Sequence, residues 1–107
     1  MGKLVRDKIP DMIRARGEKP ILEDVNKVWF ERCLRMKLIE EAQELMVAED
    51  HPDIIDEMAD CLEVLQEICI QNGMAWSHVE DRRKAKREER GGFEGCQYLI
   101  RTMPSDV

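Results

Sequence analysis

Apolar side chains recur at helical spacing along two stretches in the middle of the chain. Each residue of an α-helix turns the chain by ~100°, so positions three or four residues apart share one side. In the first stretch, the apolar residues that share a side are Phe30, Leu34, Leu38, Leu45 and Ala48. In the second, they are Ile54, Met58, Cys61, Leu62, Val64, Leu65, Ile68 and Cys69. The pattern predicts one long helix from about Asp24 to Ala48 and another from Pro52 to about Gln71.

The sequence Asp50-His51-Pro52 separates the two stretches. Proline fits the first turn of a helix but not its interior, so this break marks the end of one helix and the start of the next. Two helices joined by so short a turn are expected to run antiparallel. Asn72-Gly73 should end the second helix, because glycine readily adopts the left-handed conformation common at that position.

Shorter elements are predicted on both sides of the helical pair. Ile9-Pro10-Asp11 opens a short helix. The capping-box sequence Ser77-x-x-Glu80 opens another. Two apolar segments, Ile21-Leu22 and Gln97–Arg101, are interpreted as short strands that pair in a small β-hairpin. The expected fold class is therefore all-α, a helical bundle built on two long antiparallel helices with this hairpin added.

Two pairs of acidic residues interrupt the apolar sides of the long helices. Glu41 with Glu44 and Glu57 with Asp60 each have i,i+3 spacing, which places both members of a pair on one side of a helix. Glu41 and Glu57 fall within the apolar arcs themselves. Acidic residues on helices more often form a solvated face, but buried, unpaired carboxylates must be neutralised by protons, basic side chains or a cation. We expect these four residues to bind a hard divalent cation, for which Mg²⁺ is the first choice and Mn²⁺ a substitute.

Length and composition favour one domain spanning residues 1–107 with a packed core, since 43% of the residues are hydrophobic. No apolar run is long enough to span a bilayer, and the N-terminus lacks the apolar segment of a signal peptide. The cysteines do not have the spacing of a metal site and are interpreted as reduced thiols: Cys33, Cys61, Cys69 and Cys96. These features predict a cytoplasmic protein that does not bind membranes.

The net charge of −6 argues against nucleic acid as the main partner, but the charge is unevenly distributed. Residues 82–87 carry five bases in six positions, and the N-terminal segment is also basic. Lys86 and Arg90 share a helix face and lead into Gly91-Gly92, where basic side chains and close backbone approach suit phosphate. The alternative is a solvated helix face with neighbouring acids as partners.

The acidic pattern and its flanks together resemble a known family. Glu40-Glu41-x-x-Glu44 followed by Glu57-x-x-Asp60 is similar to the signature of the all-α nucleoside triphosphate pyrophosphohydrolases, the MazG-like proteins. The opening residues 3–10, KLVRDKIP, and the late Arg90-Gly91-Gly92-Phe93 resemble one branch of small single-domain members, which are predicted to clear noncanonical nucleotides.

This resemblance implies an enzyme that hydrolyses the bond between the α and β phosphates of a nucleotide, giving a nucleoside monophosphate and pyrophosphate. It implies Mg²⁺ on the four acidic residues, a MazG-like fold and a homodimer or homotetramer. The basic residues expected to bind the substrate are Lys3, Arg6, Lys8, Lys86 and Arg90. Glu40 lies about 40° from Glu44 around the helix and is our candidate to orient or deprotonate the attacking water.

Three other interpretations remain open. The nearest competing activity within the superfamily is that of phosphoribosyl-ATP pyrophosphohydrolase. A di-iron carboxylate bundle would need a Glu-x-x-His motif, and neither His51 nor His78 has that spacing from an acid of the pattern. A non-catalytic helical interaction module would instead pair Glu41 and Glu57 with basic residues across an interface and bind no metal.

Overall fold

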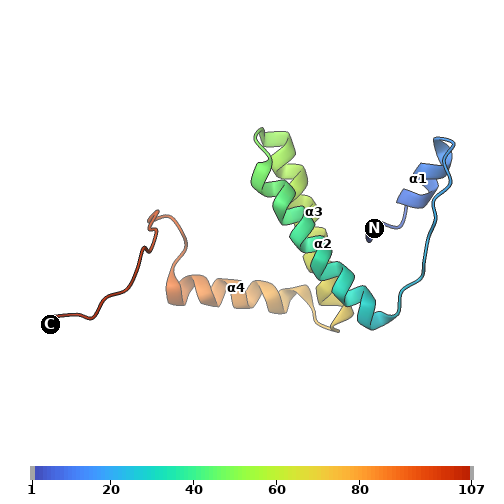
Figure 1. The fold of residues 1–107 in the computed structure, drawn as a ribbon. Helices are drawn as coiled ribbons and strands as arrows, with labels where there is room; N and C mark the ends of the chain where they lie inside the picture. The colour runs from blue at the N-terminus through green and yellow to red at the C-terminus, as the bar shows by residue number, and fades with distance from the viewer. Residues whose placement is uncertain (1, 107) are drawn as a thin grey trace. The chain divides into compact units, whose positions relative to one another are not determined.

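The computed structural model describes residues 2–106, and over this range the chain is all-helical, as predicted. Its four helices are α1 (Ile9–Ala15), α2 (Lys27–Val47), α3 (His51–Gln71) and α4 (Trp76–Arg90) (Figure 1). The chain divides into two compact units, Met1–Ala75 and Trp76–Val107. The first unit contains the two long helices and every residue of the acidic pattern.

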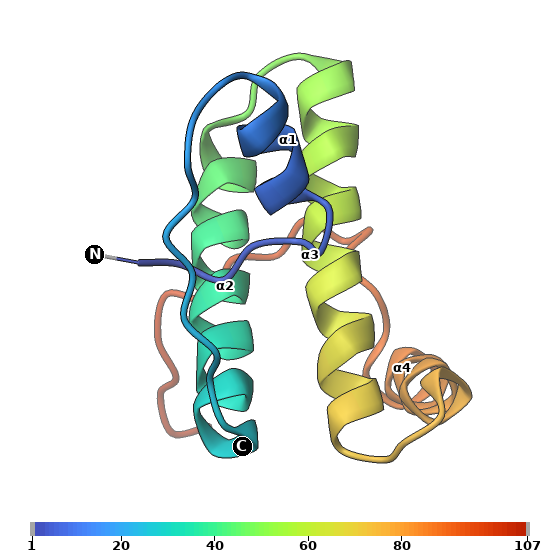
Figure 2. The same ribbon diagram turned by 90° about the vertical axis from the view of Figure 1, so that its right-hand side faces the viewer.

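Helices α2 and α3 pack side by side as the predicted antiparallel pair (Figure 2). Leu34 of α2 and Val64 and Cys69 of α3 are the buried apolar residues. Many large apolar side chains of the pair stay exposed, among them Ile39, Met46 and Ile55.

Side-chain caps fix where the long helices begin. The Asn26 Oδ1 atom accepts a hydrogen bond from the Trp29 backbone N–H at 2.9 Å, and so α2 begins at Lys27 rather than near Asp24. The Asp50 Oδ1 atom likewise accepts from the Asp53 N–H at 2.9 Å and starts α3. Three residues, 48–50, therefore connect the helices, and the short connection enforces the antiparallel arrangement.

The end of α3 is the glycine stop that the sequence predicted. Gly73 has a φ of +67°, in the left-handed region that favours glycine. The Met74 N–H donates to the Cys69 carbonyl at 3.1 Å, and the Gly73 N–H donates to the Ile70 carbonyl at 3.0 Å. This pair of bonds is a Schellman motif, which satisfies carbonyls that the helix itself leaves without partners.

The predicted hairpin is not confirmed, because residues 2–106 contain no strand. Residues 21–22 and 97–101 lack regular structure, and their side chains are exposed. A strand of only two residues, Ile21-Leu22, could form very few hydrogen bonds with a partner strand. An isolated two-stranded hairpin is in any case only marginally stable in water. The apolar side chains that suggested strands are therefore left on the surface.

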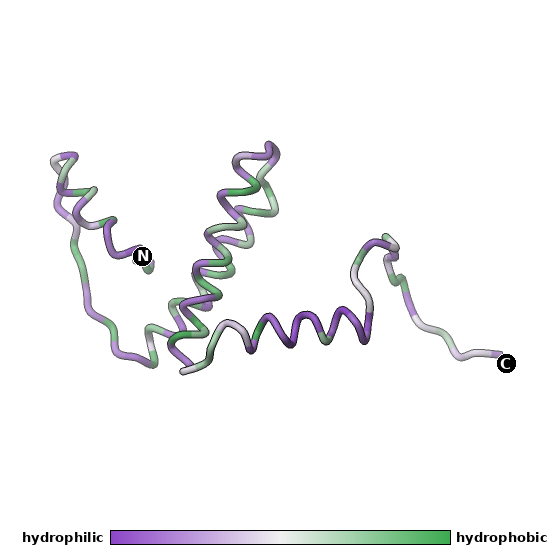
Figure 3. Tube along the Cα trace, turned by 180° about the vertical axis from the view of Figure 1, so that it is seen from behind, coloured by the Kyte–Doolittle hydropathy of each residue, from purple (hydrophilic) through white to green (hydrophobic). Residues whose placement is uncertain are grey.

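The second unit consists of α4 and the irregular segment that follows it. Helix α4 is strongly hydrophilic along its length (Figure 3). No residue between 76 and 106 is buried. Ser77 lies inside the first turn rather than before it, and Glu80 accepts hydrogen bonds from Arg83, one turn further on. The helix ends at Arg90, the next residue Gly91 has a φ of +84°, and an ion pair between Arg87 and Glu94 spans the following loop.

Over the described range, every helix is too short or too polar to cross a lipid bilayer. The four cysteines are free thiols, as the sequence suggested, and Cys69 is the buried one.

Candidate metal and phosphate site

Three of the four acidic residues of the pattern come together between α2 and α3. One carboxylate oxygen from each of Glu41, Glu44 and Glu57 lies within 4.8 Å of the other two. Glu41 and Glu44 are one turn apart on α2, and Glu57 reaches them from α3 because the helices are antiparallel. We refer to Glu41, Glu44 and Glu57 as the carboxylate cluster.

Among residues 2–106, Glu41 is the charged residue that is buried, with only 6% of its surface exposed. Its Oε2 atom and the Oε2 atom of Glu57 are buried and have no hydrogen-bond partner. Burying a carboxylate oxygen without a partner costs free energy, so such atoms are uncommon and call for an explanation. In the cluster, the two oxygens belong to facing helices, where a shared ligand could satisfy both.

The pKa values of two acids of the cluster are raised, as expected for carboxyl groups that are buried close together. Burial, together with the neighbouring carboxylates of Glu44 and Glu41, raises the pKa of Glu57 from 4.5 to about 7. The pKa of Glu41 is also raised, mainly by burial, although the adjacent Lys37 opposes the change. Without a cation, the cluster therefore keeps a proton to a higher pH than isolated carboxyl groups do.

Lys37 is a member of the site that the sequence interpretation did not single out. Its Nζ atom lies 3.3 Å from Glu41 Oε1 and 3.4 Å from Glu40 Oε1. Its side chain is only 18% exposed, so the ion pair to Glu41 is shielded from water. The sequence does contain a signal for this role. Lys37 precedes Glu40 by three residues and Glu41 by four, which are the spacings at which side chains on a helix can form ion pairs.

Asp60, the fourth acid of the pattern, is engaged by the N-terminal segment. Arg6 Nη2 donates a hydrogen bond to Asp60 Oδ1 at 2.7 Å. Both side chains are partly exposed. Three of the predicted acids thus form the cluster, and Asp60 lies beside it. Asp60 is paired with Arg6, which we expected to bind the substrate.

The first unit also contains three other predicted site residues, Lys3, Lys8 and Glu40. Lys3 Nζ is 3.9 Å from Glu40 Oε1, so Glu40 has a lysine on each side. Glu40 is half-buried and adjoins Glu41 in sequence, which keeps it near the cluster. Lys8 is exposed and has no ion pair among residues 2–106. Its role stays a prediction from the basic N-terminal motif.

Lys86 and Arg90 lie on α4, in the second unit, and both are exposed. They are one helical turn apart, as predicted, and Arg90 is the last residue of the helix. Neither forms an ion pair among the described residues, unlike the neighbouring Arg83 and Arg87. Both side chains are therefore available to an anionic ligand.

A cavity of about 450 Å³ adjoins the carboxylate cluster and shares Glu41 with it. The volume lies within the range of about 300–1,000 Å³ typical of small-molecule sites. Basic residues of the N-terminal segment and of α2 line it, namely Lys3, Arg6 and Lys37. A ligand in this cavity would meet acidic oxygens and basic nitrogens side by side.

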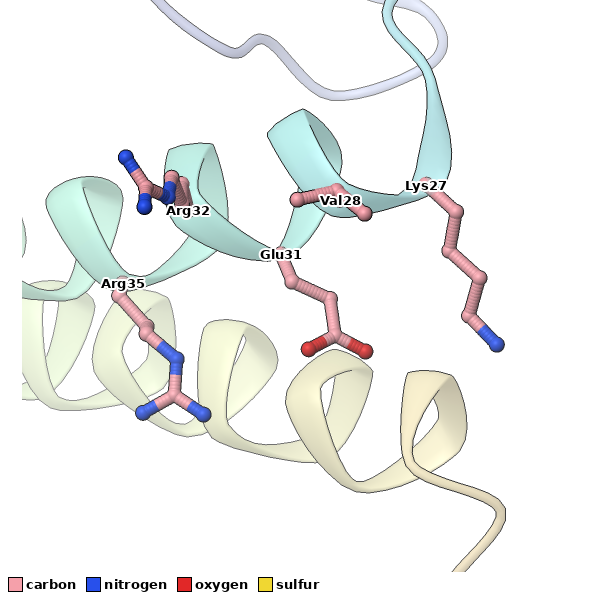
Figure 4. Close-up of a pocket in the computed structure, with 5 residues that line it drawn as sticks. All are labelled: Lys27, Val28, Glu31, Arg32 and Arg35. Carbon is pink, nitrogen blue, oxygen red and sulfur yellow. The ribbon is translucent and has the colours of Figure 1, made fainter.

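A second hollow, of about 310 Å³, runs along α2 alone. Figure 4 shows Lys27, Glu31 and Arg35 one turn apart, extending to one side of the helix. Arg32 packs instead near Trp29, with its guanidinium 5.6 Å from the centre of the ring. All the lining residues of this hollow belong to one helix, so it could not surround a ligand. We therefore place no site there.

The donor set of the cluster fits a hard cation. It offers carboxylate oxygens only, with no histidine or cysteine, and two of its buried oxygens lack partners. Mg²⁺ is bound by one or two carboxylates together with phosphate oxygens and water, which matches a compact cluster that opens into a cavity. The absence of a histidine from the cluster disfavours the di-iron alternative.

Comparisons with known proteins do not identify a family. No protein-family model matches the chain, and no solved structure matches it. An uncharacterized protein of Mycolicibacterium smegmatis is 41% identical over 49 residues, which is 46% of this chain and 50% of the relative. The chain thus matches only half the length of that relative. The function must be argued from the site.

Proposed function

We propose that this protein is a Mg²⁺-dependent nucleoside triphosphate pyrophosphohydrolase with a MazG-like fold. The observation that carries the proposal is the carboxylate cluster, in which Glu41 and Glu57 each have a buried oxygen without a hydrogen-bond partner. The adjoining cavity supports it, because basic residues line the same space. A polyphosphate needs both features, a cation held by carboxylates and positive side chains around it.

The residues of the cluster would hold the ion, and their neighbours would hold the substrate. Glu41, Glu44 and Glu57 supply the carboxylate ligands. Lys37 holds the Glu41 carboxylate in place through its ion pair at 3.3 Å. When bound, Mg²⁺ supplies positive charge that offsets the charge of the phosphates. Lys3 and Arg6 would bind phosphate oxygens in the cavity that they line.

Glu40 is the candidate general base of the reaction. It is half-buried beside the cluster and could accept a proton from a water that attacks the α phosphorus. The bond from the α phosphorus to the bridging oxygen would break, and pyrophosphate would leave with the charge stabilised by basic side chains. Lys86 and Arg90 stay candidates for that role. Noncanonical nucleotides are proposed as the substrates from the family resemblance alone.

We further propose that the protein is a homo-oligomer, a dimer or a tetramer. Helices α2 and α3 expose large apolar side chains that one antiparallel partner does not cover, including Met46 at 78% and Ile55 at 63%. The second unit has no buried residue and exposes Phe93 and Tyr98. Surfaces of this kind are typical of protein interfaces.

A non-catalytic interaction module is the second candidate. It is favoured by the ion pairs that already engage two acids of the pattern, Lys37 with Glu41 and Arg6 with Asp60. It predicts that neither Mg²⁺ nor Mn²⁺ binds.

The test is a panel of nucleoside triphosphates incubated with the purified protein and Mg²⁺, with products separated by chromatography. The proposal predicts a nucleoside monophosphate and pyrophosphate as first products, and loss of the reaction on addition of EDTA. Orthophosphate and a nucleoside diphosphate as first products would refute the assignment of the α–β bond. No product from any nucleotide, together with no heat of Mg²⁺ binding, would favour the interaction module.

A further inference from the structure

The cavity beside the carboxylate cluster continues well beyond it along α2. Its α2 lining is the stripe Phe30, Leu34, Lys37 and Glu41. Each residue of a helix rises by 1.5 Å, so this stripe extends for roughly 16 Å from the cluster to Phe30. One end of the cavity is therefore charged and adjoins the cluster, and the other end contains an aromatic ring.

The α3 lining has a matching order, because α3 runs antiparallel to α2. Asp60 lies at the end near the cluster, and Glu63, Val64 and Glu67 follow along the same side of the helix. Seven residues separate Asp60 from Glu67, which is roughly 10 Å along the axis. Glu63 and Glu67 thus line the part of the cavity that lies away from the cluster.

The far part of the cavity combines an apolar wall with hydrogen-bond acceptors. Phe30 is half-buried, and Leu34 and Val64 are buried. Glu67 Oε1 accepts one hydrogen bond, from Gln71 Nε2 at 3.1 Å. Glu63 has no hydrogen bond or ion pair among residues 2–106. Ionised carboxylates only accept hydrogen bonds, so the α3 wall of this region offers acceptors.

We propose that this far end is a nucleobase subsite that selects bases with two adjacent N–H donors, the pattern on the edge of guanine and of guanines modified elsewhere on the ring. The inference rests on the proposed function, since it takes the phosphates to lie at the cluster. The base would pack against Phe30, and the Glu63 carboxylate, assisted by Glu67, would accept from the ring N–H and the neighbouring amino group. Two parallel bonds to one planar carboxylate fix both the position and the orientation of the base.

Other bases match this arrangement less well. Adenine and cytosine place an acceptor nitrogen beside their amino group, and that nitrogen would face a carboxylate oxygen. Hypoxanthine keeps the ring N–H but lacks the amino group of guanine. A site that hydrogen-bonds a ligand group rejects an analogue lacking it, because the polar atom of the site is left unpaired.

The test compares the binding of GMP and IMP, which differ only by that amino group, by calorimetry on the full chain with Mg²⁺. Because monophosphates need not be hydrolysed, base selection is measured separately from catalysis. We expect GMP to bind about tenfold more tightly than IMP. Glu63→Gln should reduce this ratio to about one, because the NH₂ group of the glutamine amide would face an N–H donor of the base. Glu67→Gln should reduce it in part.

The matched control is Glu23→Gln, which changes an exposed carboxylate of the 18–26 segment outside the cavity. It should keep the wild-type ratio. Equal affinities of the wild-type protein for GMP and IMP, or a ratio that Glu63→Gln leaves unchanged, would overturn the base subsite even if nucleotides are hydrolysed. A GMP preference that depends on Glu63, without pyrophosphate release from any triphosphate, would keep the subsite and refute the proposed function.

Discussion

At the scale of single residues, Glu41 and Glu57 occupy positions where the apolar pattern calls for leucine. Each has a buried oxygen without a partner, and burial raises the pKa of both groups. Nearby negative charges in a partly dry environment repel one another, so the metal-free cluster is a source of instability. A bound cation would relieve this repulsion.

We therefore expect Glu41→Gln and Glu57→Gln each to abolish pyrophosphate release while leaving the metal-free fold as stable as the wild type or more stable. Removing a charge relieves the repulsion but also removes a ligand. Activity assays and thermal unfolding in EDTA measure the two effects. Glu23→Gln, which lies in a loop, is the control and should change neither. Near wild-type turnover in either cluster variant would mean that the metal site is elsewhere.

The stability of the metal-free protein should decrease as the pH rises from about 4.5 to about 7. The pKa of Glu57 is raised from its ordinary value of 4.5 to about 7 in the folded chain. Between these values the folded state holds a proton that the unfolded state has released, so raising the pH favours unfolding. The stabilising effect is complete below the lower value and lost above the higher one.

Chemical denaturation in EDTA across this pH range measures the effect as the difference between wild type and Glu57→Gln. The variant has no titrating group at this position, so the difference isolates Glu57 from the other carboxyls. A difference that does not change between pH 4.5 and 7 would show that the Glu57 carboxyl titrates normally.

At the scale of elements, much of the first unit follows from local sequence. Pro52 and Gly73 act within a few residues of themselves, so they predicted the start and the end of α3. The antiparallel pair and the meeting of Glu41 with Glu57 follow from helical periodicity and a short turn. The beginning of α2 was placed too early, because Asn26 rather than Asp24 provides the cap.

Contacts between distant residues could not be predicted in this way. Arg6 and Asp60 are 54 positions apart, and nothing in either local sequence specifies their hydrogen bond. The strands proposed for Ile21-Leu22 and Gln97–Arg101 failed for a related reason, since apolar content alone does not provide a pairing partner. The cavity, which combines residues of three segments, is also a product of tertiary structure.

The N-terminal segment makes a specific prediction, because Arg6 neutralises the acid that lies beside the cluster. Arg6→Gln should tighten Mg²⁺ binding by about two- to fivefold in the absence of nucleotide, since it frees Asp60 from a partly exposed ion pair. The same variant should raise KM, because Arg6 also lines the proposed phosphate site.

Calorimetric titration with Mg²⁺ alone measures the first effect, and steady-state kinetics measures the second. The control is Arg14→Gln, because Arg14 is about as exposed as Arg6 and pairs with Asp11 in α1, away from the carboxylate cluster. It should alter neither quantity. Weaker Mg²⁺ binding by Arg6→Gln would contradict the competition between Arg6 and the cation for Asp60.

At the scale of the whole molecule, the two units carry charge of different kinds. The first contains the acidic cluster and its cavity, and the second contains the basic residues of α4. Positive side chains suit the phosphates rather than the cation. The two types of charge should therefore contribute to different steps of binding.

Lys86→Ala and Arg90→Ala should raise KM or lower kcat, by about tenfold each, without weakening Mg²⁺ binding. Steady-state kinetics and Mg²⁺ calorimetry distinguish the two effects. Lys84→Ala is the matched control, since Lys84 is exposed on the same helix but lies about 160° from Lys86 around its axis. Unchanged kinetics in both variants would show that the basic residues of α4 form only a solvated helix face.

The central claim is that water attacks the α phosphorus of a nucleotide held at the carboxylate cluster. Hydrolysis in ¹⁸O-labelled water, with the products analysed by mass spectrometry, tests it most directly. The account predicts that the label enters the nucleoside monophosphate and that the pyrophosphate stays unlabelled. Label in the pyrophosphate, or in orthophosphate released together with a nucleoside diphosphate, would contradict it.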